Sequence, residues 1–172
     1  MTHKHNWLPV ACPPTALYAF ALFGGLVLLP LVASASHYPL NAIDIASSEE
    51  TYALYKAGVT DTKTLLEGAG KAPLRAALAK KTKLTTERLK ALAAMCDLLQ
   101  IKGVGPTVAR LLLRCKIPTL AALKAKSQAD AAALSACMAR VNKESPLTEL
   151  TPSIEFLENW IRAAKDLESL VD

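Results

Sequence analysis

The sequence predicts an all-α protein, in which two related helical units form one compact domain. Ala and Leu dominate the 172 residues, 52% of which are hydrophobic but only 5% aromatic, and runs of β-branched residues typical of strands are missing. Apolar residues recur at helical spacing, as at Leu89, Leu92 and Leu99. Residues 51–66 also resemble residues 109–124, and residues 84–98 resemble residues 150–167. These internal similarities predict two copies of one helical unit.

The first copy is expected over residues 36–83. Ser47 and Glu50 have the spacing of a capping box, so a helix should start there, and Gly58 should end it as a left-handed cap. A second short helix from Thr60-Asp61 is expected to break at the glycines of residues 68–70. Pro73 then suits the first turn of a third helix.

The second copy is expected over residues 84–172. Thr85 or Thr86 should cap a longer helix, and a turn at residues 101–106 should lead into the next one, followed by a short helix in residues 120–125. Ser127 with Asp130 is expected to cap a helix that runs to about Asn142. Thr151-Pro152 should start the last helix, as cap plus first-turn proline.

Residues 1–35 have the pattern of a signal peptide. Lys4 gives a positive start, residues 15–33 are apolar and uncharged, and Pro30 precedes the small-x-small sequence Ala33-Ser34-Ala35. We therefore expect cleavage after Ala35 and export to a periplasm, a lumen or the extracellular space. The alternative is an uncleaved transmembrane anchor formed by residues 15–33, since 19 apolar residues can just span a bilayer.

The charge is unevenly distributed along the chain. Residues 36–67 carry five acids and two bases, residues 68–129 thirteen bases and two acids, and residues 130–172 eight acids and four bases. A basic segment of this kind is often only a solvated helix face. It also suits an anionic partner, such as nucleic acid, the acidic protein surface of a larger complex, or anionic lipid.

Three cysteines lie beyond the signal: Cys96, Cys115 and Cys137. An oxidising compartment would permit one disulfide, but we expect three buried thiols that act as small apolar residues. His37 is the only histidine beyond the signal, so no metal and no cofactor are expected. One histidine and scattered carboxylates offer no nucleophile, base and orienting group, and catalysis is not expected.

The candidate site is the sequence Ile101-Lys-Gly-Val-Gly-Pro106, here called the glycine turn (residues 101–106), with the helix that follows it. Two glycines permit unusual backbone angles and close approach of a phosphate, and Pro106 suits a first helical turn. The free amides at the start of the helix would bind an anion, with basic side chains nearby. The predicted site consists of Lys102, Gly103, Val104, Gly105, Thr107, Val108, Arg110 and Arg114. The alternative is a purely structural turn between two helices.

This pattern, Ile-x-Gly-Val-Gly-Pro-x-x-Ala followed by apolar Leu111 and Leu112, resembles the helix-hairpin-helix family. Members that bind DNA often have a lysine or arginine after the proline, where this chain has Thr107. The wider sequence, from CDLLQIKGVGPTVARLLLRCKIPTLAALKAK through ARVNK to ENWIRAAKDL, resembles domain of unknown function family 4332 over about residues 50–168. Asp97-Leu98 and Trp160-Ile161 match its opening and closing motifs. The resemblance implies a tandem helix-hairpin-helix fold and no particular activity.

Two functions are therefore expected as alternatives. The first is sequence-independent binding of nucleic-acid backbone outside the cytoplasm, as in the helix-hairpin-helix DNA receptors of bacterial competence systems, which the chain resembles in outline. The second is a structural or adaptor role on a larger periplasmic, lumenal or membrane complex. An extrinsic helix-hairpin-helix protein of oxygen-evolving photosystems offers an analogy for that role.

Overall fold

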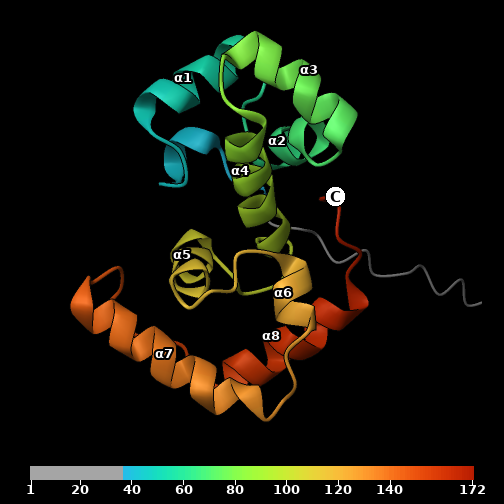
Figure 1. Cartoon of the computed structure of the whole chain (residues 1–172). Helices are drawn as coiled ribbons and strands as arrows, with labels where there is room; N and C mark the ends of the chain where they lie inside the picture. Colours follow the sequence, from blue (N-terminus) through green and yellow to red (C-terminus); the bar gives the residue numbers. More distant parts are fainter. Residues whose placement is uncertain (1–36) are drawn as a thin grey trace, which may run out of the picture. The chain divides into compact units, whose positions relative to one another are not determined.

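The computed structural model describes residues 37–172, which fold into helices, without strands in that range (Figure 1). The expected all-α class is confirmed. A short 3-10 helix and eight α-helices follow one another in the described range: η1 Leu40–Ala42, α1 Ser48–Lys56, α2 Thr62–Ala69, α3 Ala72–Thr82, α4 Thr86–Leu98, α5 Pro106–Arg114, α6 Leu120–Lys124, α7 Asp130–Glu144 and α8 Ile154–Asp166.

Helix α4 connects the two halves of the domain. It packs against α2 and α3 on its N-terminal side and against α5 and α6 on its C-terminal side, as Figure 1 shows. All residues from Leu92 to Leu99 are buried, so α4 has no solvent-facing stripe over that length. A helix that is apolar on every side must be enclosed by other elements, and α4 therefore forms the centre of the core. Helices α7 and α8 pack together and cover α5 and α6.

Local capping signals determine most of the helix starts. Ser47 and Glu50 form the expected capping box of α1, and Asp61 with Thr64 forms a second capping box on α2. Thr85 caps α4 by accepting from the backbone N–H of Arg88. Each of these bonds satisfies an amide that the first helical turn leaves free.

Two predicted helix starts are wrong. Ser127 is not the N-cap of α7; the N-cap is Ala129, which makes no side-chain cap bond. Ser127 instead donates its backbone N–H and its hydroxyl to the carboxylate of Asp130. The end of α7 at Glu144 agrees with the expected end at about Asn142. Helix α8 is capped by Ser153 rather than by Thr151-Pro152, with the Ser153 hydroxyl accepting from the N–H of Phe156 at 3.4 Å. Where several capping residues follow one another, sequence does not decide which one the packing selects.

The turn between α1 and α2 recurs 58 residues later between α5 and α6. Gly58 and Lys116 both have positive φ, of 85° and 63°. The next residue donates in both places to a buried leucine carbonyl, Val59 to Leu54 and Ile117 to Leu112. The two turns therefore have the same hydrogen-bond pattern, at the offset that the sequence similarity indicates.

The expectation of three buried thiols is wrong, because Cys115 and Cys137 form a disulfide. Cys115 follows α5 and Cys137 lies on α7, and their Cα atoms are 6.0 Å apart, within the usual range. Cys96 remains a thiol, and its burial on α4 raises its pKa to about 12. Such a thiol carries almost no thiolate and is unreactive at neutral pH.

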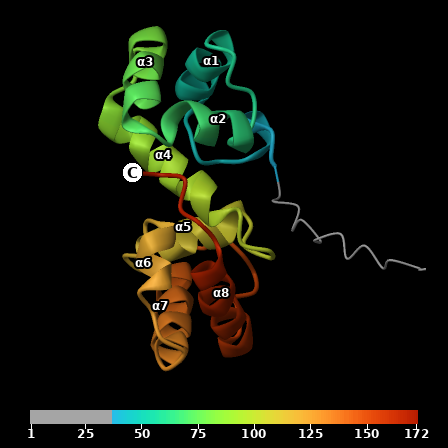
Figure 2. The ribbon, with the colours of Figure 1, turned by 90° about the vertical axis from the view of Figure 1, so that its right-hand side faces the viewer.

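The C-terminal tail, residues 167–172, runs from α8 back along α4 to the N-terminal half (Figure 2). The buried carboxylate of Asp97, 1% exposed, receives three donors there: Gln100 Nε2 at 2.6 Å, Ser169 Oγ at 2.7 Å and the Leu170 N–H at 3.2 Å. Asp97 is thus the anchor of the tail.

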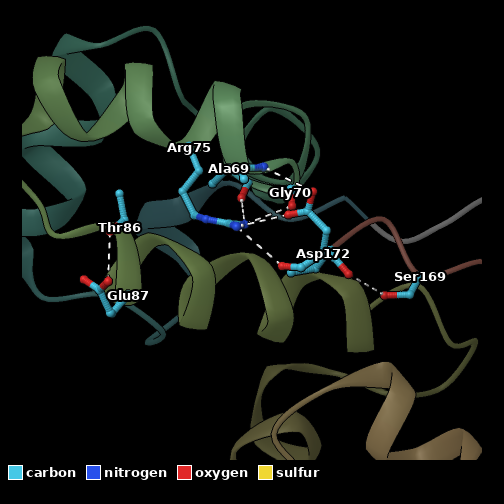
Figure 3. Close-up of polar contacts among 9 residues, drawn as sticks. Ala69, Gly70, Arg75, Thr86, Glu87, Ser169 and Asp172 are labelled. Carbon is cyan, nitrogen blue, oxygen red and sulfur yellow. Dashed lines mark hydrogen bonds and ion pairs between the residues drawn. The ribbon is translucent and has the colours of Figure 1, made fainter.

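A buried arginine holds the last residue of this tail. Arg75 donates to the carbonyls of Ala69 and Gly70 and to the carboxylate of Asp172 at 3.0 Å (Figure 3). Asp172 also accepts from the N–H of Ala72, and these bonds together with Arg75 lower the pKa of Asp172. The tail therefore connects α8 to α2 and α3 through polar contacts.

Candidate functional site

The glycine turn is fixed by two buried side chains on either side of an exposed tip. Ile101 and Val104 are 1% and 2% exposed, whereas Lys102 and Gly103 lie at the surface. The N–H of Val104 donates to the carbonyl of Ile101 at 2.9 Å and closes the turn. Gly103 has a φ of 89°, in the left-handed region where other residues are strained. The side chains that hold the turn thus leave its backbone accessible.

Gly105 does not have the unusual backbone angles that we expected. Its φ of −91° and ψ of 177° are extended, and a Cβ built on it would have no neighbour within 4 Å. Any residue could adopt this conformation. The missing side chain of Gly105 therefore serves no packing purpose in the fold, and its effect is to leave the start of α5 open.

The first amides of α5 have no acceptor among the described residues. Gly105 is the N-cap and has no side chain, Pro106 has no N–H, and the amides of Gly105, Thr107 and Val108 donate to no group in the described part of the chain. Free amides at a helix N-terminus, together with the helix dipole, form a site that attracts an anion. Of the predicted site, Lys102, Gly103, Gly105, Thr107 and Val108 thus reach the surface, whereas the side chain of Val104 is buried and its N–H closes the turn.

The two arginines of the predicted site are engaged elsewhere. Arg110 forms an ion pair with Asp44 and also donates to the Asp44 carbonyl. Arg114 donates to the carbonyl of Ser145 at 2.6 Å. Lys102 has no ion pair within residues 37–172, and it is the charge that the turn itself presents. Both arginine contacts join parts of the chain that are far apart in sequence, so sequence patterns did not indicate them.

In the basic segment of residues 68–129, arginines and lysines have different roles. Arg75, Arg88 and Arg110 each pair with a carboxylate that lies outside the segment. The lysines form no ion pair within the described range. Lys124 donates to the carbonyl of Leu167, and the other lysines carry the free positive charge of the segment: Lys71, Lys80, Lys81, Lys83, Lys90, Lys102, Lys116 and Lys126. The surface charge of the segment is therefore smaller than the sequence count indicates, but it remains positive.

The ion pair of Arg88 with Glu50 fastens α4 to the start of α1. Arg88 donates to both carboxylate oxygens of Glu50, at 2.7 and 2.8 Å, and also to the carbonyl of Ile45. The hydrogen bonds from Arg88, and those from Ser47, lower the pKa of Glu50 to about 2. The same pairing raises the pKa of Arg88. Glu50 thus remains charged wherever the domain is folded at ordinary pH.

An aromatic pair that sequence reasoning did not connect with the turn lies directly beside it. A Cβ built on Gly103 would lie 3.2 Å from Nε1 of Trp160. Trp160 stacks on Phe156, with ring centroids 6.0 Å apart and an interplanar angle of 29°. Gly103, Phe156 and Trp160 line one open groove of about 400 Å³, together with residues 150–153. The only sequence signal was the closing motif of the family, which contains Trp160.

The described residues contain no cluster of His, Cys, Asp and Glu side chains that could hold a metal ion. None of the helices described is long and apolar enough to cross a membrane. Residues 1–35, with the predicted signal peptide and the alternative anchor at residues 15–33, lie outside the described range.

A sequence profile of the family described as domain of unknown function (DUF4332) matches residues 45–167. The chain belongs to the DUF4332 family. The match extends from the lead-in to α1 to the end of α8, so the glycine turn, the aromatic pair and Asp97 all lie within the DUF4332 domain. No curated protein and no solved structure matches the chain.

Proposed function

We propose that this DUF4332 protein is a non-catalytic binding module of the helix-hairpin-helix type, which binds nucleic-acid backbone without reading sequence. The observation that carries the proposal is the open N-terminus of α5, where three amides lack an acceptor within the described residues. Phosphate oxygens are the natural partners of such amides, and contacts to phosphate carry no base information. Lys102 and the other unpaired lysines would add a salt-dependent attraction.

The domain offers an internal comparison for this site. We propose that residues 36–83 and 84–172 are related units, supported by the matching turns at Gly58 and Lys116. At the same offset of 58 residues, Ser47 corresponds to Gly105. The hydroxyl of Ser47 accepts from the N–H of Glu50, so the first unit satisfies its helix start with its own side chains. The second unit leaves the equivalent amides free for a ligand.

We also propose that residues 1–35 are a signal peptide cleaved after Ala35, so that the module acts outside the cytoplasm. The Cys115–Cys137 disulfide supports an oxidising compartment, since such bonds are rare in reducing cytosol. N-terminal sequencing of the protein from its native source should find Ser36 as the first residue. An intact N-terminus in a membrane fraction would instead support the anchor at residues 15–33.

Fluorescence anisotropy with labelled oligonucleotides of mixed sequence tests the proposed function. The affinity should be nearly independent of sequence and should fall steeply, by at least about 10-fold, between about 50 and 200 mM salt. Gly105→Glu should abolish most binding, because its carboxylate would stand among the free amides while the backbone conformation stays accessible. Ala132→Glu, on the exposed side of α7, makes the same change of charge and should leave the affinity within about 2-fold. Absent or salt-insensitive binding would contradict the proposal.

A second candidate function is docking onto a larger protein complex. Three exposed apolar residues favour it, Leu150, Ile154 and Phe156, with 83%, 46% and 59% of their surface accessible. Exposed apolar patches often mark interaction surfaces. A stable complex that keeps its size after nuclease treatment of a native extract would support docking, and elution as a monomer would count against it.

A further inference from the structure

The groove between the glycine turn and α8 joins two kinds of surface. On one side is the exposed turn backbone at Gly103, two residues before Gly105, the first residue with a free amide. On the other side are Phe156 and Trp160 with their apolar neighbours Leu150 and Pro152. A ligand that extends along the groove from the turn would contact hydrogen-bond donors at one end and an aromatic face at the other.

Trp160 adds a donor to this groove. The residue is only 6% exposed, and its Nε1–H has no acceptor among the described residues. Within residues 37–172, Arg110 Nε is the one buried side-chain N or O atom without a partner, so the Trp160 N–H itself reaches the surface, where it can only donate. Because Gly103 has no side chain, the space 3.2 Å from Nε1 stays empty. Any other residue at position 103 would fill that space, so the glycine keeps the indole N–H accessible from the turn.

Phe156 supplies the aromatic face. It is 59% exposed although its ring stacks on Trp160, so the buried tryptophan supports one side of the phenylalanine and leaves much of the ring accessible. Aromatic side chains held in this way next to backbone contacts are the usual platforms for unpaired nucleobases. An aliphatic partner would gain no more binding free energy from contact with Phe156 than from contact with Leu150.

The charges beside the groove give the ligand a direction. In the chain, exposed Lys102 directly precedes the groove residue Gly103, whereas exposed Glu149 and Glu155 directly precede the groove residues Leu150 and Phe156. A phosphate is therefore favoured at the turn and disfavoured at α8, where an uncharged base fits better. A duplex would bring a second phosphate backbone toward the acidic side, and its bases would not be free to stack.

We infer that the groove binds a single strand of nucleic acid: a phosphate accepts from the Trp160 N–H and the amides of the turn, and the adjoining base stacks on Phe156. The inference rests on the proposed function and narrows its ligand to unpaired strands. The turn then binds the phosphate backbone of the strand, and the aromatic pair distinguishes single strands from duplexes.

The test measures the affinity of the full chain for three labelled probes of about 20 nucleotides: oligo-dT, a mixed-sequence duplex and an abasic strand. Oligo-dT should bind at least about 10-fold more tightly than the duplex. Phe156→Leu, which keeps an apolar side chain without a ring, should weaken oligo-dT binding by about 10-fold and leave the abasic strand unchanged. Tyr52→Leu, which removes an exposed aromatic residue from α1, is the matched control and should have no effect.

Trp160→Phe tests the indole N–H separately, because it keeps an aromatic ring in the core and removes the donor. The variant should weaken the binding of all three probes by a similar factor and should have an unchanged circular dichroism spectrum. Equal affinity for oligo-dT and duplex, with no effect of Phe156→Leu, would overturn the inference and leave the proposed function standing. Absence of binding to every probe would overturn both. Binding of an apolar peptide that Phe156→Leu abolishes, with no difference between the probes, would assign the groove to a protein partner instead.

Discussion

Replacing Asp97 tests whether the C-terminal tail stabilises the whole domain. The carboxylate is 1% exposed and accepts three hydrogen bonds, two of them from residues of the tail, Ser169 and Leu170. Asp97→Ala would leave the partly buried N–H of Leu170 without its acceptor and would release Ser169. A hydrogen bond to a charged group contributes about 1.5–3 kcal/mol, and an unsatisfied donor costs about 1–3 kcal/mol. Since donors freed at the end of the tail can reach water, we expect a total loss of about 3 kcal/mol.

Urea unfolding followed by circular dichroism measures this loss as a change in the free energy of unfolding. Ser169→Ala should lower the free energy of unfolding by about 1 kcal/mol. In the Asp97→Ala background the same substitution should lower it much less, because the hydrogen bond from Ser169 to Asp97 is already absent there. Asp166→Ala removes an exposed carboxylate from α8 and should change stability by less than about 0.5 kcal/mol. If Asp97→Ala also costs less than about 0.5 kcal/mol, or if its effect adds fully to that of Ser169→Ala, the tail does not stabilise the domain in this way.

Four further outcomes are expected. Lys116→Gly should stabilise the domain by about 0.5–1 kcal/mol in urea unfolding, because glycine relieves the positive φ. Glu50→Gln should cost about 1 kcal/mol at pH 7. Since the folded pKa of Glu50 is about 2, below its ordinary value of 4.5, this difference should shrink as the pH falls from about 4.5 toward 2. Reducing the Cys115–Cys137 disulfide, whose cysteines are 22 positions apart, should lower stability by about 3 kcal/mol. Gly105→Ser should stabilise α5 by a few tenths of a kcal/mol yet weaken oligonucleotide binding, because the new hydroxyl would accept from the free amides.

The features that sequence predicted correctly are local. The capping box of Ser47 and Glu50 and the left-handed Gly58 each depend on residues within one helical turn, so their spacing alone determines the geometry. The offset of 58 residues was also visible, because both turns place buried leucines and a capping residue at the same intervals. The glycine turn itself followed from its residue order, and Gly103 has the positive φ that was expected.

The features that sequence did not predict depend on contacts between distant parts of the chain. Arg110 pairs with Asp44 across 66 positions, so its availability to a ligand could not be judged from its own surroundings. The Cys115–Cys137 disulfide requires α5 and α7 to lie side by side, and the Trp160 contact requires the middle of α8 to lie beside the glycine turn. Charge counts and periodicity contain no information on such pairings, because many packings satisfy the same pattern.

The comparison of the two helix starts explains why the glycine turn differs from an ordinary connection. Gly105 and Ser47 have similar extended angles, φ −91° and ψ 177° against φ −66° and ψ 164°, so a capping side chain would fit at both positions. A turn that only joined two helices would be more stable with such a cap, since free amides next to the core are costly unless water or a ligand satisfies them. Gly103 likewise leaves the Trp160 N–H without an acceptor within the described residues. Both glycines thus leave donors without an acceptor in the described part of the chain, and the phosphate ligand proposed above would accept from both sets.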